Sequence, residues 1–157
     1  MKGIEKTNVC RVLDQKKIEY NLHSYDADPT LTGVDIAGIL GEPKECVFKT
    51  LVTEGKSKEY YVFVVPVEAE LDLKKAAKAA GEKSIEMIKQ KDLLSLTGYV
   101  HGGCSPIGMK KQFKTFIHET ATSYERIFVS AGKVGFQIEL APSDLIETSN
   151  ITVSDII

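Results

Sequence analysis

Apolar and polar residues follow one another along this chain in short blocks that predict small helices and strands in mixed order. Between residues 72 and 80 the apolar positions recur every three or four residues behind Asp72, and Gly81 follows. This pattern is typical of an amphipathic helix with an aspartate cap and a glycine stop. The run 60–65 is apolar throughout, which predicts a strand buried on both faces.

The same reasoning places the other elements. We expect helices over residues 7–17, 34–40, 72–80, 90–96 and 143–148. We expect strands over residues 19–25, 47–53, 60–67, 84–88, 115–118, 126–130 and 136–140, and a polar turn around Pro29. Because strands and short helices are intermixed without strict alternation, the sequence predicts a mixed α/β (α+β) fold with a mixed sheet that curls around one core. A length of 157 residues without repeat or linker predicts a single domain over residues 1–157.

Composition narrows the class of protein. With 43% hydrophobic and 27% charged residues, the chain has the balance of a folded domain. It contains no apolar run of about 18 residues, so we expect no membrane span. Three widely spaced cysteines and the lack of a signal-peptide pattern predict free thiols and a cytoplasmic location.

Charge is unevenly distributed along the chain. The segment 72–114 holds nine lysines and four acidic residues, whereas the whole chain carries a net charge of −2. A basic segment in an acidic protein is typical of a face that docks a polyanion. The alternative interpretation is a set of solvated helix faces.

Residues 102–108 form the most unusual segment of the chain. Its seven residues include three glycines and Pro106, which excludes an ordinary helix or central strand. Such a segment predicts a rigid loop whose main-chain groups hold a small polar ligand. It lacks the closing Gly-Lys-Ser/Thr of a phosphate-binding loop, so nucleotide hydrolysis is not expected.

Individual side chains suggest several kinds of chemistry. Cys104 lies three residues after His101, but a small apolar filler is the favoured interpretation of that cysteine. Without a second ligand pair, the sequence predicts neither a metal nor a cofactor. Lys49 shares a predicted strand face with Leu51, which indicates either a sheet edge, the more common case, or a lysine that reaches into a pocket. Ser130 ends a strand, where its hydroxyl could stabilise the turn or orient a ligand.

Four motifs follow one another in the order seen in the YbaK family: Phe48-Lys49-Thr50-Leu51, Leu71-Asp72-Leu73-Lys74-Lys75-Ala76-Ala77-Lys78, the glycine-rich segment from Thr97 to Lys111, and Val129-Ser130-Ala131-Gly132-Lys133. His23-Ser24-Tyr25 with Asp28-Pro29 is similar to that family's N-terminal segment. The resemblance covers nearly the whole chain. It implies a partly barrel-like sheet and the editing of aminoacyl-tRNA, since this family comprises free-standing relatives of the prolyl-tRNA synthetase editing domain.

The resemblance also implies roles for residues. The catalytic candidates are Lys49, Gly102 and Ser130. The substrate-binding candidates are Tyr25, Leu31, Thr32, Gly103, Cys104, Ser105, Pro106 and Gly132. The tRNA-binding candidates are Lys74, Lys75, Lys78, Lys110 and Lys111. The implied partners are aminoacyl-tRNA, bound at its 3′ end, and prolyl-tRNA synthetase.

The YbaK branch of the family hydrolyses Cys-tRNA(Pro), and the resemblance implies the same reaction here, with attack by the substrate's own thiol. The sequence departs from the family at three places: an aromatic pocket residue is missing near Leu31 and Thr32, Val134 replaces a basic residue, and Gln137 replaces an acidic one. Two alternatives therefore stay open. One is a deacylase for alanyl or seryl esters, and the other is a non-catalytic module that binds tRNA or a synthetase.

Overall fold

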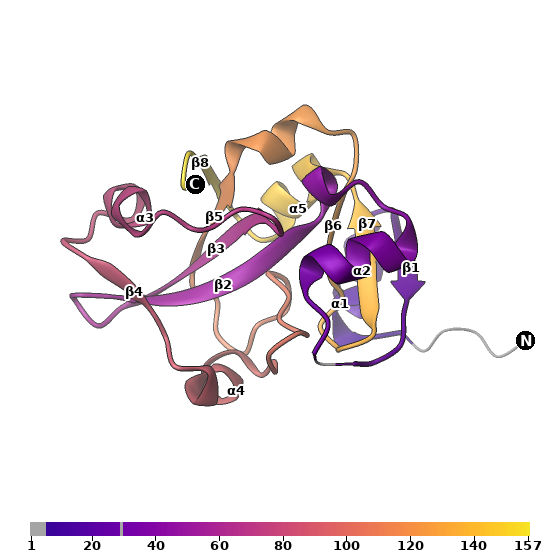
Figure 1. The fold of residues 1–157 in the computed structure, drawn as a ribbon, viewed down its shortest axis with the longest axis horizontal. Coiled ribbons are helices and arrows are strands. Elements are labelled where there is room, and N and C mark those ends of the chain that lie inside the picture. The colour runs from indigo at the N-terminus through magenta and orange to yellow at the C-terminus, as the bar shows by residue number, and fades with distance from the viewer. Residues whose placement is uncertain (1–5, 29) are drawn as a thin grey trace, which may run out of the picture.

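The computed structural model describes residues 6–28 and 30–157 as a mixed α/β fold of two β-sheets and short helices (Figure 1). The helices are α1 (Asn8–Gln15), α2 (Gly33–Leu40), α3 (Leu73–Ala80), α4 (Leu93–Thr97) and α5 (Pro142–Thr148). The strands are β1 (Tyr20–Ser24), β2 (Phe48–Gly55), β3 (Tyr60–Pro66), β4 (Ile85–Met87), β5 (Lys114–His118), β6 (Ile127–Ser130), β7 (Phe136–Leu140) and β8 (Thr152–Ser154). Three 3-10 turns are η1 (Lys44–Cys46), η2 (Gln90–Asp92) and η3 (Glu119–Ser123).

Every helix and strand expected from the sequence is present, with bounds that shift by a few residues. The expected helix over 90–96 divides into η2 and α4, and the strand β8 was not expected. Pro29, at the centre of the predicted turn, lies outside the described residues. At α3 the local signals act as predicted: the Asp72 carboxylate accepts from the N–H of Lys74 and Lys75, and Gly81 ends the helix at φ 74°.

The strands form two sheets, of order β1-β7-β6 and β4-β2-β3-β5-β8. The larger sheet is mixed, because β3 and β5, and β5 and β8, run parallel while its other pairs are antiparallel. Val47 and Phe128 join the two sheets through a parallel bridge. The mixed α/β class is therefore confirmed, but the expected single curled sheet is two sheets, and the described strands do not close a barrel.

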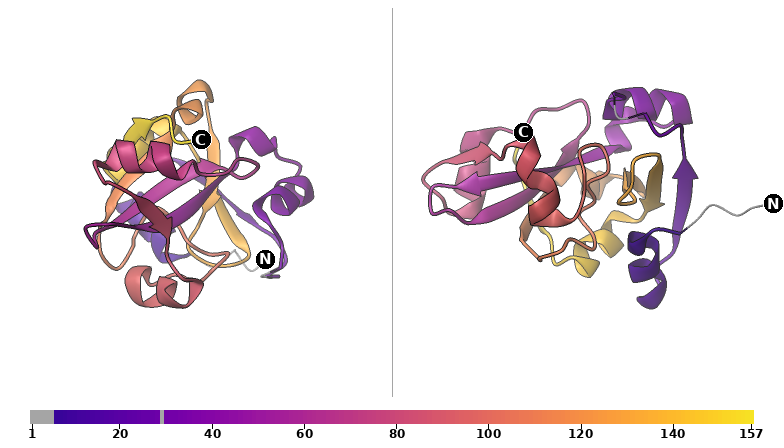
Figure 2. Two further views of the ribbon diagram at one scale, coloured as in Figure 1. Left: turned by 60° about the vertical axis from the view of Figure 1, so that its left-hand side comes forward. Right: turned by 90° about the horizontal axis from the view of Figure 1, so that it is seen from below.

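The larger sheet is covered on both faces. Phe63 and Val65 of β3 pack with Ala76 and Ala77 of α3 on one face, whereas Val62 packs with residues of α4 on the other. Figures 1 and 2 show α3 and α4 on opposite sides of the β2–β3 hairpin. The apolar run of β3 is thus buried on both faces, as its composition predicts. No helix among the described residues is long and apolar enough to cross a membrane.

Candidate functional site

The glycine loop, residues 102–108, packs with its main chain directly on the turn that joins β6 and β7. A Cβ added at Gly103 would lie 2.9 Å from the Val134 nitrogen and 3.2 Å from the Lys133 carbonyl carbon. Gly102 adopts φ 87°, a conformation that favours glycine. Two segments far apart in the sequence therefore meet backbone to backbone, which only a glycine at position 103 permits.

Internal hydrogen bonds hold the glycine loop in shape. The Gly103 N–H donates to the Val100 carbonyl at 2.9 Å, and the Ile107 N–H donates to the Ser105 hydroxyl at 3.3 Å. The Tyr99 hydroxyl donates to the Ile107 carbonyl. Ser105 and Pro106 are buried, so these two side chains are part of the loop's internal framework.

Four main-chain donors of the loop are left over. Among the described residues, the N–H groups of Gly102, Cys104, Ser105 and Gly108 have no hydrogen-bond acceptor. Gly102 is exposed, so water can serve its N–H, whereas Cys104 is half-buried and Ser105 is buried. Unpaired main-chain groups are rare in buried segments, and a ligand or water usually completes them. A loop of this kind can bind an anion or a polarised carbonyl oxygen.

The Cys104 thiol does not have the environment of a nucleophile. Burial raises the pKa of Cys104 to about 12, although a hydrogen bond with Thr97 opposes the shift. Near neutral pH the thiol is therefore protonated, and it packs against both apolar clusters that adjoin the loop. This environment is that of the apolar filler favoured by the sequence.

Ser130 stands where β6 enters the turn contacted by the glycine loop. Its hydroxyl accepts a hydrogen bond from the Gly132 N–H at 3.1 Å, so it stabilises the turn. Gly132 adopts φ 93°, and a Cβ there would lie 3.0 Å from side-chain carbons of Tyr99 and Val9. The turn is therefore as tightly packed as the loop that rests on it.

β2 is an interior strand over Thr53–Gly55, where β4 pairs with it. At Lys49 it pairs with Val65 of β3 on one side, and no described residue is paired with Lys49 on the other, which agrees with the sheet-edge interpretation. Lys49 and Ser130 each follow the parallel Val47–Phe128 bridge by two residues. Because side chains alternate along a strand, Lys49 and Ser130 belong to the same face as the bridge residues. Ser130 thus shares a face with Lys49 and begins the turn that carries the glycine loop.

Thr50 carries a polar group that the sequence did not single out. Its hydroxyl oxygen is buried and has no hydrogen-bond partner among the described residues. Alternation places it on the opposite face from Lys49, which is the face where Val52 and Cys104 pack. A buried hydroxyl without a partner costs free energy, which indicates a place where a ligand or water is accepted.

The three substrate-binding candidates between β1 and α2 differ in whether they lie near the β6–β7 turn. The Tyr25 N–H donates to the Gly135 carbonyl at 2.9 Å, so Tyr25 lies beside the β6–β7 turn. The Thr32 hydroxyl accepts from the Asp35 N–H at 3.1 Å and caps α2. Leu31 is half-buried. Of the three residues, Tyr25 is the one that the structure places against the turn.

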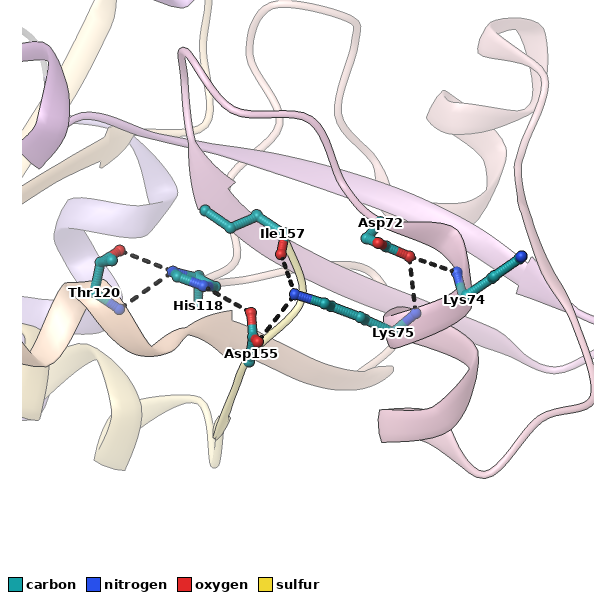
Figure 3. A network of polar contacts seen from close by, with 7 residues as sticks. All are labelled: Asp72, Lys74, Lys75, His118, Thr120, Asp155 and Ile157. Atoms are coloured by element: carbon teal, nitrogen blue, oxygen red, sulfur yellow. Dashed lines mark hydrogen bonds and ion pairs between the residues drawn. The ribbon is translucent and has the colours of Figure 1, made fainter.

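The basic segment does not form one continuous surface. Lys74, Lys75 and Lys78 lie on α3, whereas Lys110 and Lys111 follow the glycine loop beside α4, across the sheet from α3. The Lys75 ammonium donates to Asp155 at 3.0 Å and to the Ile157 carbonyl at 2.6 Å (Figure 3). Lys75 thus ties α3 to the last residues of the chain, while Lys110, Lys111 and Lys133 are exposed next to the glycine loop.

A polar cluster on the three-stranded sheet was missed by the sequence reasoning. His23, Gln137 and Ser130 are register partners across β1, β7 and β6, so their side chains form a row on one face. His23 contacts Glu139 at 2.8 Å. With its amide oriented to satisfy both groups, Gln137 donates to the two carboxylate oxygens of Glu42 at 2.9 and 2.7 Å.

The two carboxylates of this cluster differ in pKa. Burial raises the pKa of Glu42 to about 7, against the opposing charge of His23. Burial also acts to raise the pKa of Glu139, but hydrogen bonds from His23 and Asn21 bring it below its usual value. Glu42 sits in the short connection between α2 and η1, where no sequence pattern distinguishes it from a solvated loop residue.

Two open hollows of the surface, of about 940 and 470 Å³, lie beside β1 and beside α5. Neither hollow is lined by Lys49, Ser130 or the glycine loop. The described residues contain no group of three His, Cys, Asp or Glu side chains that could hold a metal ion. The candidate site offers main-chain donors, a lysine, hydroxyls and a carboxylate.

Solved structures share this fold. A crystal structure described as a hypothetical protein superposes with a TM-score of 0.87 at 21% identity, covering 96% of this chain and 99% of its own. Another, described as "a putative trans-editing enzyme for prolyl tRNA synthetase", superposes with a TM-score of 0.81 at 20% identity, covering 97% and 98%. At these identities the likeness shows a shared fold.

Sequence relatives identify the family to which this chain belongs. Residues 27–148 match the family model of the aminoacyl-tRNA editing domain. The chain is 48% identical over 147 residues to an Enterococcus faecalis (strain ATCC 700802 / V583) protein named "Putative Cys-tRNA(Pro)/Cys-tRNA(Cys) deacylase EbsC", covering 93% of this chain and 90% of the relative. It is 26% identical over 113 residues to the uncharacterized protein YwhH of Bacillus subtilis (strain 168), covering 72% and 71%. The chain belongs to the aminoacyl-tRNA editing domain family, which confirms the resemblance drawn from its motifs. It is an aminoacyl-tRNA editing enzyme.

Proposed function

We propose that this enzyme hydrolyses the ester of mischarged Cys-tRNA(Pro). The observation that carries the proposal is the set of unpaired N–H groups at Gly102, Cys104 and Ser105, in a loop fixed against the Ser130 turn. An aminoacyl ester is already activated, so an enzyme must above all hold its carbonyl and stabilise the charge that develops on the oxygen. The 48% identity to a protein named as a deacylase for cysteinyl esters favours cysteine as the amino acid.

The nucleophile in this proposal comes from the substrate. The cysteinyl sulfur attacks the ester carbonyl carbon, the bond from that carbon to the ribose oxygen breaks, and the thiol proton ends on the ribose hydroxyl. The resulting cyclic thioester is then opened by water. Holding the two reacting groups together contributes about 7–11 kcal/mol to such an intramolecular step.

The residues of the site take separate roles. The glycine loop cradles the carbonyl oxygen through its main chain. Lys49 places a positive charge at the 3′-terminal phosphate or ribose. Ser130 holds the turn in the conformation on which the glycine loop packs. Lys110 and Lys111 extend the positive charge along the acceptor end of the tRNA. The protonated Cys104 packs the loop and takes no part in bond breaking.

Deacylation of Cys-, Ala- and Ser-tRNA, each charged on tRNA(Pro), tests the proposed reaction. Cysteinyl ester should be lost at least about 100-fold faster than the other two, since alanine and serine carry no thiol. Faster loss of alanyl or seryl ester would identify the enzyme as an editor of those amino acids. Salt-dependent tRNA binding without any turnover would contradict catalysis altogether. Adding prolyl-tRNA synthetase to the assay tests whether that partner supplies the choice of tRNA.

A further inference from the structure

Glu42 is held over the same sheet face as Ser130. Its N–H donates to the Ala37 carbonyl at 2.8 Å, which closes the end of α2. Its two carboxylate oxygens accept from the Gln137 amide at 2.9 and 2.7 Å. Gln137 is 4% exposed, so a buried amide fixes the position of this carboxylate.

The charge of Glu42 has no matching cation. On the same face, Glu139 contacts His23 at 2.8 Å and Arg126 at 3.5 Å. Among the described residues, Glu42 forms no ion pair. Burial raises the pKa of Glu42 to about 7, and the nearby charge of His23 opposes that shift without cancelling it. A cation that arrived beside this carboxylate would favour its ionised form and would be bound in return.

The position of Glu42 relates it to the proposed reaction. Gln137 is the register partner of Ser130, so the carboxylate of Glu42 is one side chain away from Ser130. Every aminoacyl ester carries an ammonium group on the carbon next to its carbonyl. A site that fixes the ester carbonyl at the glycine loop therefore also holds the substrate's ammonium group, which lies within a few bonds of that carbonyl.

We propose that Glu42 binds the α-ammonium group of the aminoacyl substrate. It thereby selects esters with an unblocked amino group and rejects N-acylated ones. This inference rests on the proposed function, because it assigns the amino end of the same substrate. Gln137 holds the carboxylate in place, and Glu139 is unsuited to the role because it is already in contact with His23 and paired with Arg126.

Single-turnover rates on two substrates test the assignment: Cys-tRNA(Pro), and N-acetyl-Cys-tRNA(Pro) with its thiol free. The wild-type enzyme should prefer the unblocked ester by about 10–100-fold, the range of a hydrogen bond to a charged group. Glu42→Gln keeps an acceptor for Gln137 but removes the charge, so it should slow the unblocked substrate alone and abolish most of the preference. Glu45→Gln is the matched control, since Glu45 is exposed on η1 nearby, and it should keep the full preference.

The possible results distinguish a failure of the role given to Glu42 from a failure of the proposed deacylase function. Equal wild-type rates on the two esters would overturn the role of Glu42 while leaving the deacylase intact. So would an undiminished preference in Glu42→Gln. Loss of both reactions in the wild-type enzyme would instead refute the proposed function. The wild-type comparison needs no variant, so equal rates on the two esters would refute the role of Glu42 even where Glu42→Gln fails to fold.

Discussion

Val47 and Phe128 pair in a parallel bridge that links the two sheets of this protein. The bridge brings Lys49 and Ser130 to one face, each two residues beyond it. Lys49 lies in the Phe48-Lys49-Thr50-Leu51 motif, and Ser130 leads into the turn that supports the glycine loop. In the proposed site, the bridge is what relates these two motifs, which lie about 80 residues apart in the sequence.

Replacement of Lys49 by alanine should remove a positive charge near the bound ester. We expect deacylation of Cys-tRNA(Pro) to fall by about 10²-fold or more, the typical cost of losing one group that stabilises the transition state. Lys56→Ala is the control, because Lys56 is exposed in the β2–β3 hairpin. Unchanged turnover in Lys49→Ala would refute the role given to this lysine.

The two glycines of the loop should respond differently to alanine. Gly102→Ala places a Cβ at φ 87° but only in ordinary contact, 3.5 Å from Val134, so its cost is backbone strain of about 1–2 kcal/mol. Gly103→Ala brings the Cβ to 2.9 Å from the Val134 nitrogen and must push the loop off the turn. Denaturant unfolding and kcat measured together should show the larger loss of kcat in Gly103→Ala.

Gly38→Ala is the matched control for these substitutions. Gly38 lies in α2, and nothing approaches an added Cβ within 4 Å. Alanine there should stabilise the protein by about 0.5–1 kcal/mol and leave kcat unchanged. A normal kcat in both loop variants would show that the glycine loop is not the carbonyl cradle.

The sequence predicted local features of this fold well. The helix α3 follows from its own residues, since Asp72 caps it, Gly81 ends it and apolar positions at helical spacing face the sheet. The glycine-rich loop was recognised for the same reason, because its conformation depends on glycines within the loop. Features that depend on neighbours distant in sequence were harder to predict. The pattern around Lys49 left both a sheet edge and a pocket open, because strand order is not visible in a strand's own pattern.

Glu42 shows this limit most clearly. Its chemical character arises from Gln137 and His23, which are contributed by β7 and β1. Nothing in the connection 41–43 indicates that partnership, and His23 by itself looked isolated. Strand β8 was missed for a related reason, as its three residues pair with β5 and carry too little pattern of their own.

The lysines beside the glycine loop should contribute to tRNA binding. Lys110→Ala and Lys111→Ala should each weaken binding and reduce the dependence of affinity on salt, since each removes one phosphate contact. Lys75→Ala should instead lower the melting temperature slightly, because Lys75 is paired with Asp155 and Ile157. Titrations with tRNA at several salt concentrations measure this difference. An equal loss of tRNA affinity in Lys75→Ala would indicate that α3 also lies on the tRNA path.

Glu42 should make stability depend on pH. Its pKa rises from 4.5 to about 7 in the folded protein. The protonated carboxyl therefore favours the fold, and its contribution is fully present below about pH 4.5 and is lost as the pH rises through about 7. Glu42→Gln removes this titration. The free energy of unfolding of Glu42→Gln, relative to that of the wild-type protein, should therefore increase between about pH 4 and pH 8.

Urea unfolding of both proteins across that range measures the gain. Glu45→Gln serves again as the control, with a difference from wild type that stays constant with pH. A constant difference in Glu42→Gln as well would mean that the carboxylate is not buried as the fold indicates. A gain in stability together with the loss of amino-group preference would show that Glu42 is kept for function at a cost in stability.

The central claim is that the reacting thiol belongs to the substrate and not to Cys104. The most direct measurement compares the hydrolysis of Cys-tRNA(Pro) with that of its S-methylated form, by the wild-type enzyme and by Cys104→Ala. We expect both enzymes to cleave the cysteinyl ester at similar rates, and neither to cleave the S-methylated ester above background. Near-total loss of activity in Cys104→Ala, with rapid wild-type cleavage of the S-methylated ester, would contradict this account.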